Sequence, residues 1–210
     1  MKEFNWHIAA EKEWDERATF WSKQSQQMWS TGSRSSIIPF LMEYLQDNSI
    51  ILDAGCGDGY GSYLLNQQGY QVVGVDISAE MIDKANTRHQ TNTLTFMQSD
   101  ITQLPFEDET FSGVMAINSL EWTEQPLRAI NEIKRVTKTG GIFCIGFLGP
   151  TAGPRQHAYR RLYGESVICN TMMPWELELL VSENGWSVND GKPVYKAAVS
   201  SETARGLPKE

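Results

Sequence analysis

The segment IILDAGCGDGYG, residues 50–61, decides how this chain folds. It begins with the apolar run Ile50–Leu52 and passes directly into a turn that has glycine at every second position from 55 to 61. Glycine permits positive φ angles and a close approach of other groups to the backbone, and a helix that follows such a turn offers free N–H groups. The segment therefore predicts a strand, a ligand-binding turn and a helix, which is typical of an open α/β sheet.

The residues that follow repeat this alternation of strand and helix. Apolar runs predict four further strands, at 72–75, 94–97, 113–117 and 142–147. A helix that starts near Thr123 has apolar residues at helical spacing and is expected to end at Gly140 and Gly141. Short apolar strands without alternation indicate a sheet that is covered on both faces. We therefore predict a doubly wound, Rossmann-like α/β fold with a mainly parallel sheet and helices on both faces.

Residues 1–46 are predicted to form a helical lid on the main domain, residues 47–210. Tryptophans at positions 6, 14, 21 and 29 lie seven or eight residues apart in a helix-forming stretch. Because two helical turns take about 7.2 residues, these rings share one stripe. We expect Trp6 and Trp14 to pack against the domain and Trp29 to line a substrate pocket. A loop-rich insertion at about 149–173 is expected to face the substrate.

Composition and charge exclude several classes of function. The 210 residues carry a formal net charge of −8, which repels phosphate backbones and disfavours a nucleic-acid partner. The three cysteines are widely spaced and no CxxC or Cys/His cluster occurs, so neither a disulfide framework nor a metal site is predicted. The longest apolar stretch, Ile142–Leu148, is too short to span a bilayer. We expect a cytoplasmic protein without membrane insertion.

The end of the second predicted strand carries a carboxylate, Asp76. This placement suits two ribose hydroxyls that donate to one carboxylate, an arrangement found with two classes of nucleotide cofactor. The dinucleotide fingerprint would need glycine at position 60 or 62, and these positions hold Tyr60 and Ser62. The pattern therefore disfavours a nicotinamide cofactor.

Two strings resemble motifs of the class I S-adenosylmethionine-dependent methyltransferases. ILDAGCGDG at 51–59 resembles the first motif of that family, and VGVDIS at 73–78 resembles the second. The similarity to a small branch that includes quinone-biosynthesis enzymes rests on LPF at 104–106, Phe111, NEIKRV at 131–136 and the glycine pair at 140–141. The resemblance covers about residues 50–148.

This resemblance implies S-adenosylmethionine as the cofactor and a set of residues that bind it. The glycine turn would face the methionine part, Asp76 would bind the ribose, and Asp100 would meet the adenine amino group. The predicted cofactor-binding residues are Asp53, Gly55, Cys56, Gly57, Asp76, Ile77, Asp100, Ile101 and Asn118, together with Arg34, which we expect to reach the cofactor carboxylate.

The acceptor side of the site is less defined. Many relatives carry a histidine pair just after the fourth strand, where this chain has SLEW at 119–122. His157 and Glu121 are the candidate bases, and a solvated loop histidine and a solvated surface carboxylate are the simpler interpretations. Trp29, Trp122 and Tyr159 are expected to line the substrate pocket.

The resemblance also implies an antiparallel strand pair at the C-terminus, which we expect to be atypical or truncated. Trp186–Val188 predicts a sixth strand, and only residues 194–199 are left for a seventh. That segment is short, and its alanines have weak β-propensity.

The favoured function is a methyltransferase that acts on a small, partly apolar molecule by in-line transfer without a metal. A nucleotide-binding oxidoreductase is one alternative, and a non-catalytic S-adenosylmethionine-binding regulatory protein is another. The sequence does not define the oligomeric state.

Overall fold

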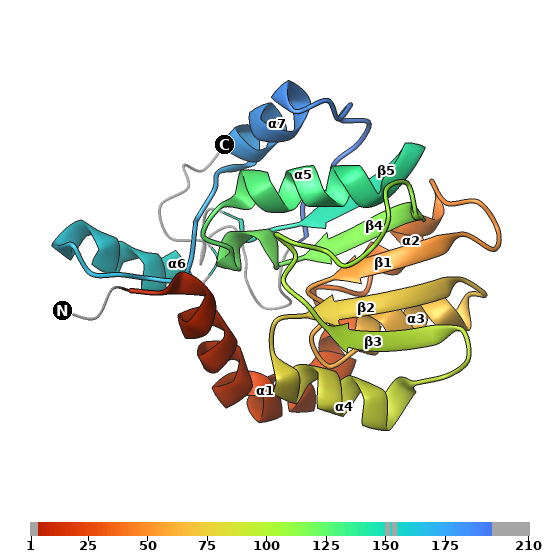
Figure 1. Cartoon of the computed structure of the whole chain (residues 1–210), viewed down its shortest axis with the longest axis horizontal. Coiled ribbons are helices and arrows are strands. Elements are labelled where there is room, and N and C mark those ends of the chain that lie inside the picture. The colour runs from red at the N-terminus through yellow and green to blue at the C-terminus, as the bar shows by residue number, and fades with distance from the viewer. Residues whose placement is uncertain (1–3, 150–151, 153–154, 195–210) are drawn as a thin grey trace.

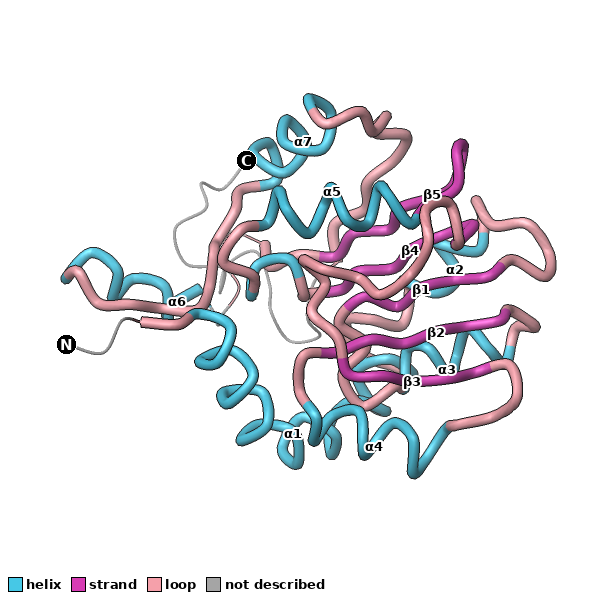
Figure 2. Tube along the Cα trace, in the orientation of Figure 1, coloured by secondary structure: helices cyan, strands magenta, loops and turns pink. Residues whose placement is uncertain are grey.

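The computed structural model describes residues 4–149, 152 and 155–194. Over these residues the chain forms a parallel sheet of five strands in the order β3-β2-β1-β4-β5 (Figures 1 and 2). The strands are β1 (Ile50–Ala54), β2 (Gln71–Asp76), β3 (Leu94–Gln98), β4 (Phe111–Ile117) and β5 (Thr137–Gly146). The order reverses between β1 and β4, which is where open α/β sheets bind ligands. The predicted Rossmann-like fold is confirmed.

Helices cover both faces of the sheet, as the apolar strands predict. Successive side chains of β1 point to opposite faces, so Ile51 and Leu52 belong to two different buried clusters. The Ile51 face is covered by α2 (Ile37–Met42), α3 (Tyr60–Gln67) and α4 (Ala79–His89). The Leu52 face is covered by α5 (Pro126–Val136) and α7 (Pro174–Glu183).

The N-terminal helix α1 (Trp6–Ser30) lies along α4 and α3 (Figure 1). It begins at Asn5, whose side chain accepts a hydrogen bond from the N–H of Ile8 at 3.1 Å. Three short elements complete the described structure: η1 (Leu120–Trp122), α6 (Arg155–Ala158) and η2 (Tyr159–Tyr163). In Figure 2, α6 and η2 project from the body of the molecule beyond the end of α1.

The prediction that Gly140 and Gly141 end the helix before the fifth strand is wrong. α5 ends at Val136, and both glycines lie within β5. Phe111 pairs with Thr137, and the next pair is Gly113 with Ile142. Between these pairs β4 advances by two residues and β5 by five. Gly140 has φ +77°, a conformation that suits glycine at such an irregularity.

The predicted strand at Trp186–Val188 is absent from the described structure. α7 ends at a turn in which Gly185 has φ +84°, and the N–H of Trp186 donates to the carbonyl of Val181 at 3.1 Å. This bond back to the helix end takes the donor that a strand ladder would need. The Trp186 ring instead packs 5.0 Å from the Phe143 ring of β5. All but the first residue of the segment 194–199 lies outside the described residues.

Candidate functional site

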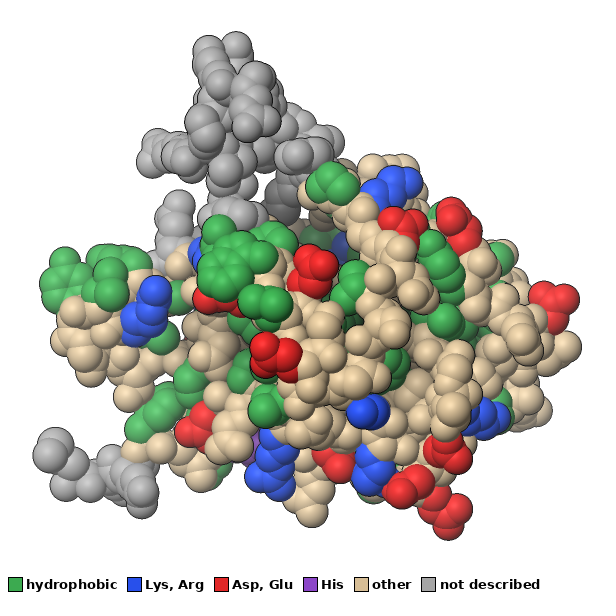
Figure 3. Space-filling model, turned by 90° about the horizontal axis from the view of Figure 1, so that it is seen from above, with side chains coloured by type: hydrophobic (Ala, Val, Ile, Leu, Met, Phe, Trp, Pro, Cys, Tyr) green, Lys and Arg blue, Asp and Glu red, His purple; other side chains and the backbone are tan. Residues whose placement is uncertain are grey.

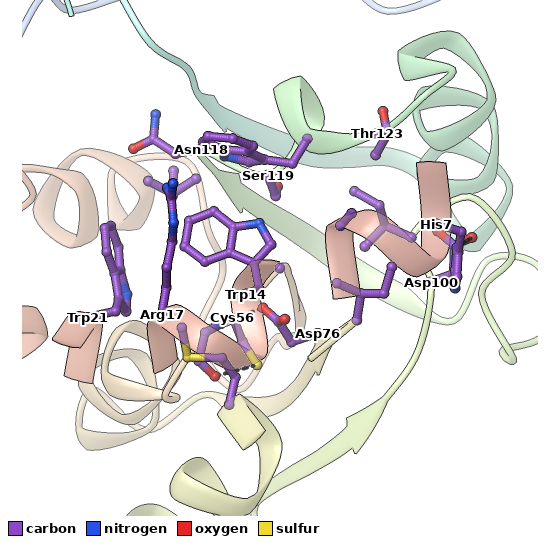
Figure 4. Close-up of a pocket in the computed structure, with 18 of the residues that line it drawn as sticks. His7, Trp14, Arg17, Trp21, Cys56, Asp76, Asp100, Asn118, Ser119 and Thr123 are labelled. Carbon is purple, nitrogen blue, oxygen red and sulfur yellow. Dashed lines mark hydrogen bonds and ion pairs between the residues drawn. The ribbon is translucent and has the colours of Figure 1, made fainter. Parts of the chain in front are cut away.

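A cleft of about 1110 Å³ lies at the carboxyl ends of the strands, with α1 along its other side (Figure 4). The ends of β1, β2 and β4 contribute residues from the glycine turn, Asp76 and Asn118. Figure 4 shows the Trp14 indole of α1 between Asn118 and Ser119 on one side and Asp76 on the other. The cleft is therefore at the crossover point of the sheet, where the sequence predicts ligand binding.

The glycine turn forms one wall of the cleft. Gly55 and Gly57 have φ angles of +84° and +56°. A Cβ added to Gly55 would lie 2.4 Å from the Cβ of Ser119, so this position has no room for a side chain. At Gly57 an added Cβ would point to the Trp21 indole at 3.4 Å. These glycines keep the backbone of the turn open to a ligand.

Asp76 is buried where the turn meets the end of β2. Its carboxylate accepts hydrogen bonds from the N–H groups of Gly57 at 2.9 Å and Ser78 at 3.0 Å. Burial raises the pKa of Asp76, and these two backbone donors oppose that shift. Two oxygens with four lone-pair sites leave acceptor capacity for donors from the cleft.

Asp100 lies at the far end of the cleft, after β3. It accepts hydrogen bonds from the N–H of Thr102 at 2.9 Å and the Thr102 hydroxyl at 2.6 Å. Nδ1 of His7, from the first turns of α1, lies 3.1 Å from Oδ2 of Asp100. Figure 4 shows this pair side by side. The N-terminal helix thus contacts the residue to which the family resemblance gives the adenine.

A second group of polar side chains lies behind the opposite end of the cleft. Nη2 of Arg34 donates to Oδ1 of Asn118 at 3.0 Å, and Nδ2 of Asn118 donates to Oε1 of Glu121 at 3.2 Å. The Arg34 guanidinium lies 4.8 Å from the Trp21 ring centre and 5.3 Å from that of Trp29. Burial lowers the pKa of Arg34 to about 10. Even so, its guanidinium stays protonated at neutral pH and favours an anionic ligand.

Most of the predicted site residues lie together along this cleft. Gly55, Cys56, Gly57, Asp76, Ile77, Asp100, Ile101, Asn118, Arg34 and Trp122 all line it. Asp53 is buried beneath the turn, where it accepts a hydrogen bond from the Ser62 hydroxyl at 2.6 Å. Burial raises the pKa of Asp53 to about 7. A direct contact of Asp53 with the cofactor is therefore not supported, and its place is under the floor of the site.

Two of the predicted pocket residues lie elsewhere. Trp29 is 6% exposed and packs in the core against Gly61, where an added Cβ would lie 2.5 Å from the ring. Tyr159 is 48% exposed on η2, beside Leu162 and Tyr163. Figure 3 shows hydrophobic side chains exposed at this end of the molecule. The prediction that Trp29 and Tyr159 line the pocket is wrong.

Of the two candidate bases, Glu121 differs from the simpler interpretation. Glu121 is 1% exposed and is not a solvated surface group. It is not one of the residues that line the cleft. His157 belongs to α6, and its side chain lies outside the described part of the structure.

Sequence reasoning missed several cleft residues on α1. His7, Trp14, Trp21 and Met28 all line the cleft and are spaced by seven residues. The spacing of seven is the signal that could have identified them, because residues seven apart lie on one side of a helix. A residue one position further along is rotated by about 100° around the helix axis. Trp29 is thereby rotated into the core, while Trp6 reaches the cleft edge and donates to the carbonyl of Trp122 at 2.8 Å.

Two further features of the described residues are negative. They contain no group of three His, Cys, Asp or Glu side chains that would hold a metal ion. No helix in the described ranges is long and apolar enough to cross a membrane.

Comparisons with known proteins agree with the geometry. Residues 52–145 match the family model described as a methyltransferase domain. A malonyl-acyl-carrier-protein O-methyltransferase from Pectobacterium atrosepticum is 31% identical over 115 residues, which are 54% of this chain and 45% of that relative. The match thus spans less than half of the relative's length.

Two solved structures share the fold. A Haloferax volcanii methyltransferase, solved in complex with the Trm112 methyltransferase activator, has a TM-score of 0.74 at 21% identity and covers 90% of this chain and 82% of that one. An S-adenosylmethionine-dependent methyltransferase from Methanosarcina mazei has a TM-score of 0.59 at 26% identity and covers 69% of this chain and 82% of that one. Residues 52–145 are thus a methyltransferase domain, and these matches together with the glycine turn and Asp76 indicate S-adenosylmethionine as its cofactor.

Proposed function

We propose that this protein transfers a methyl group from S-adenosylmethionine to a small, partly apolar acceptor. The observation that carries the proposal is the cleft in which the Gly57 backbone, the Asp76 carboxylate and the Asp100 carboxylate face one common space. These groups match a cofactor with a ribose diol, an adenine and an amino-acid end. The family match over residues 52–145 supports the same cofactor.

The residues of this chain fit the cofactor in a consistent order along the cleft. Asp76 would accept hydrogen bonds from the ribose hydroxyls, and Asp100 with Ile101 would receive the adenine. Asn118 and Arg34 would hold the amino-acid end, because Arg34 carries a positive charge and a carboxylate is a suitable partner. The glycine turn would lie along the methionine part. Cys56 lines the same wall, and burial raises the pKa of its thiol, which disfavours a nucleophilic role.

Alignment is the main contribution that the protein makes to such a reaction. Bound S-adenosylmethionine supplies a methyl group on a sulfonium, which is already activated for displacement. Positioning of two reactants contributes about 7–11 kcal/mol to a bimolecular step. The tryptophans of α1 would hold an apolar part of the acceptor, and Trp14 packs edge-on to Trp21 at 5.8 Å and to Trp122 at 5.0 Å.

The N-terminal segment, residues 1–46, acts in this proposal as a lid over the domain of residues 47–210. Its anchor is polar and buried: the hydroxyls of Ser22 and Ser25 donate to Asp58 of the glycine turn at 3.0 and 2.7 Å. The first turns of α1 are held by fewer and more exposed contacts, such as His7 with Asp100. Opening of these first turns would admit ligands, and closure would exclude water.

The acceptor is best matched by a nucleophile that needs no general base. Among the described residues that line the cleft, His7 is the only histidine, and it is engaged with Asp100. A carboxylate is ionised at neutral pH without assistance. Arg17 and Arg128 line the cleft and suit such a group. The relative from Pectobacterium atrosepticum is an O-methyltransferase that acts on malonyl-acyl-carrier protein, which favours an oxygen acceptor here as well.

Calorimetric titration with S-adenosylhomocysteine tests cofactor binding, with NADH as the comparison. Asp76→Ala removes hydrogen bonds to a charged group, each worth about 1.5–3 kcal/mol, and is expected to weaken S-adenosylhomocysteine binding at least tenfold. An unchanged dissociation constant would contradict the role of Asp76. Turnover with a panel of small carboxylic acids separates the enzyme from a non-catalytic binding protein. Tight NADH binding would instead favour an oxidoreductase.

The remaining expectations about partners follow from charge. A net charge of −8 disfavours nucleic acid, so a small-molecule acceptor is proposed. A cytoplasmic location is proposed on the same sequence grounds as before.

A further inference from the structure

Glu121 is a buried carboxylate that joins three parts of the chain behind the cleft. Its Oε1 accepts hydrogen bonds from the N–H of Leu148, after β5, at 2.8 Å and from Nδ2 of Asn118, after β4, at 3.2 Å. Its backbone carbonyl accepts from the N–H of Asn170 at 2.6 Å. Its Oε2 is buried and has no hydrogen-bond partner among the described residues. A buried carboxylate oxygen without a hydrogen-bond partner destabilises the folded state, so its presence calls for a functional or structural explanation.

Asn118 is the residue through which Glu121 reaches the cleft. Asn118 has φ +54°, a left-handed conformation that asparagine tolerates better than most residues. Its amide nitrogen faces Glu121, and its amide oxygen accepts from Arg34 at 3.0 Å. A flipped amide would place its NH₂ group against the guanidinium and its oxygen against the carboxylate. Glu121 therefore fixes the orientation in which Asn118 presents itself to Arg34.

Charge links the same three residues. Arg34 is half-buried, and its guanidinium lies close to the rings of Trp21 and Trp29. The negative charges of Asp53 and Glu121 oppose the effect of this burial on Arg34. Burial raises the pKa of Glu121, and the positive charge of Arg34 is among the groups that oppose this shift. Loss of Glu121 would leave this half-buried cation with weaker compensation.

We propose that Glu121 is a positioning residue that holds Asn118 and Arg34 in place for the amino-acid end of the cofactor. This inference rests on the proposed function. It also replaces the hypothesis that Glu121 is a general base, because the side chain is covered by Asn118 and Leu148 and does not line the cleft. Glu121 thus acts on the cofactor through its two neighbours rather than on the acceptor.

The test compares Glu121→Gln with Glu121→Ala, and Glu183→Gln on the exposed face of α7 is the matched control. Glutamine keeps an acceptor for Asn118 but loses the charge, whereas alanine loses both. We expect the dissociation constant of S-adenosylhomocysteine to rise three- to tenfold in Glu121→Gln and more than tenfold in Glu121→Ala. In turnover, KM for the cofactor should rise while kcat of Glu121→Gln stays within about twofold, with an unshifted pH profile.

A double-mutant cycle identifies the route of the effect. If Glu121 acts partly through Asn118, then Glu121→Ala should weaken binding less in an Asn118→Ala background than in the wild-type background. Full additivity of the two substitutions would overturn the proposal, as would wild-type affinity in Glu121→Ala. A large loss of kcat in Glu121→Gln with normal cofactor affinity would also overturn it and restore the general base. If the unaltered protein does not bind S-adenosylhomocysteine, the proposed function fails before this inference is reached.

Discussion

Trp29 and Trp21 are eight residues apart on one helix, yet the structure predicts different consequences for their loss. Trp29 is 6% exposed and packs against Gly61, whereas Trp21 is half-buried and lines the cleft. Removal of a buried tryptophan costs about 3–5 kcal/mol. Trp29→Ala also removes the cation–π contact with the Arg34 guanidinium, which lies 5.3 Å from the ring centre. We therefore expect the free energy of unfolding to fall by the upper value of this range, about 5 kcal/mol.

Urea unfolding followed by far-ultraviolet circular dichroism measures both variants without relying on tryptophan fluorescence. Trp21→Ala should lower the free energy of unfolding by only about 1–2 kcal/mol. Its main effect should be weaker binding of ligands in the cleft. An equal loss of stability in the two variants would refute the placement of Trp29 in the core.

Gly61 provides a reciprocal control for the same packing. A Cβ at position 61 would lie 2.5 Å from the Trp29 ring, so Gly61→Ala should destabilise the protein by about 1–3 kcal/mol. In a Trp29→Ala background the overlap is gone, and alanine is favoured over glycine in a helix by about 1 kcal/mol. The same substitution should then stabilise the protein. A destabilising effect in both backgrounds would show that the ring does not lie against Gly61.

Three further predictions concern the polar groups under and around the cleft. The pKa of Asp53 rises from 3.8 in the unfolded chain to about 7 in the folded one, so its contribution is fully present below pH 3.8 and is lost as the pH rises through about 7. The loss is at most about 4 kcal/mol. The free energy of unfolding in urea should therefore fall less from pH 5 to pH 8 in Asp53→Asn than in the wild type, and equal falls would contradict the raised pKa of Asp53. Ser22→Ala combined with Ser25→Ala should lower the free energy of unfolding by about 2–4 kcal/mol, because Asp58 is 2% exposed and loses two hydrogen-bond donors. An unchanged thermal midpoint would show that these two hydroxyls do not anchor α1. His7→Ala should change the free energy of unfolding by less than about 1 kcal/mol, because the contact of His7 with Asp100 is partly exposed. The same substitution should speed proteolysis within residues 1–34, and an unchanged rate would show that His7 does not hold the first turns of α1.

The fold and the cofactor side of the cleft were predictable from the sequence because they depend on local signals. The apolar strands, the glycine turn and the cap of α4 each depend on a few neighbouring residues; at this cap the Ser78 hydroxyl accepts from the N–H of Met81 at 3.1 Å. Parallel strands then bring Asp76, Asp100 and Asn118 to one edge of the sheet without further information. Eight of the ten predicted residues that line the cleft lie at or just after strand ends, whereas Arg34 and Trp122 come from other segments.

The parts that were not predictable depend on tertiary contacts. The irregular pairing of β5 with β4 around Gly140 is not contained in the local sequence, which fits a helix end equally well. Similarly, nothing in SLEW at 119–122 distinguishes a solvated carboxylate from a buried one. The burial of Glu121 becomes visible only when Leu148 and Asn170 close over it from distant segments.

The seven-residue stripe of α1 explains how one helix serves both the core and the cleft. A residue on a straight helix advances by about 100°, so seven residues fall about 20° short of two full turns. His7, Trp14, Trp21 and Met28 therefore stay on nearly one line along the cleft. Trp29, one residue beyond that line, turns inward against α3, and Ser22 and Ser25 turn to Asp58. Residues that line the cleft and residues that make buried contacts thus alternate on the same helix, and a movement of α1 that changes the shape of the cleft must also strain the buried side. This coupling favours opening of the first turns, where exposed contacts predominate, over displacement of the whole helix.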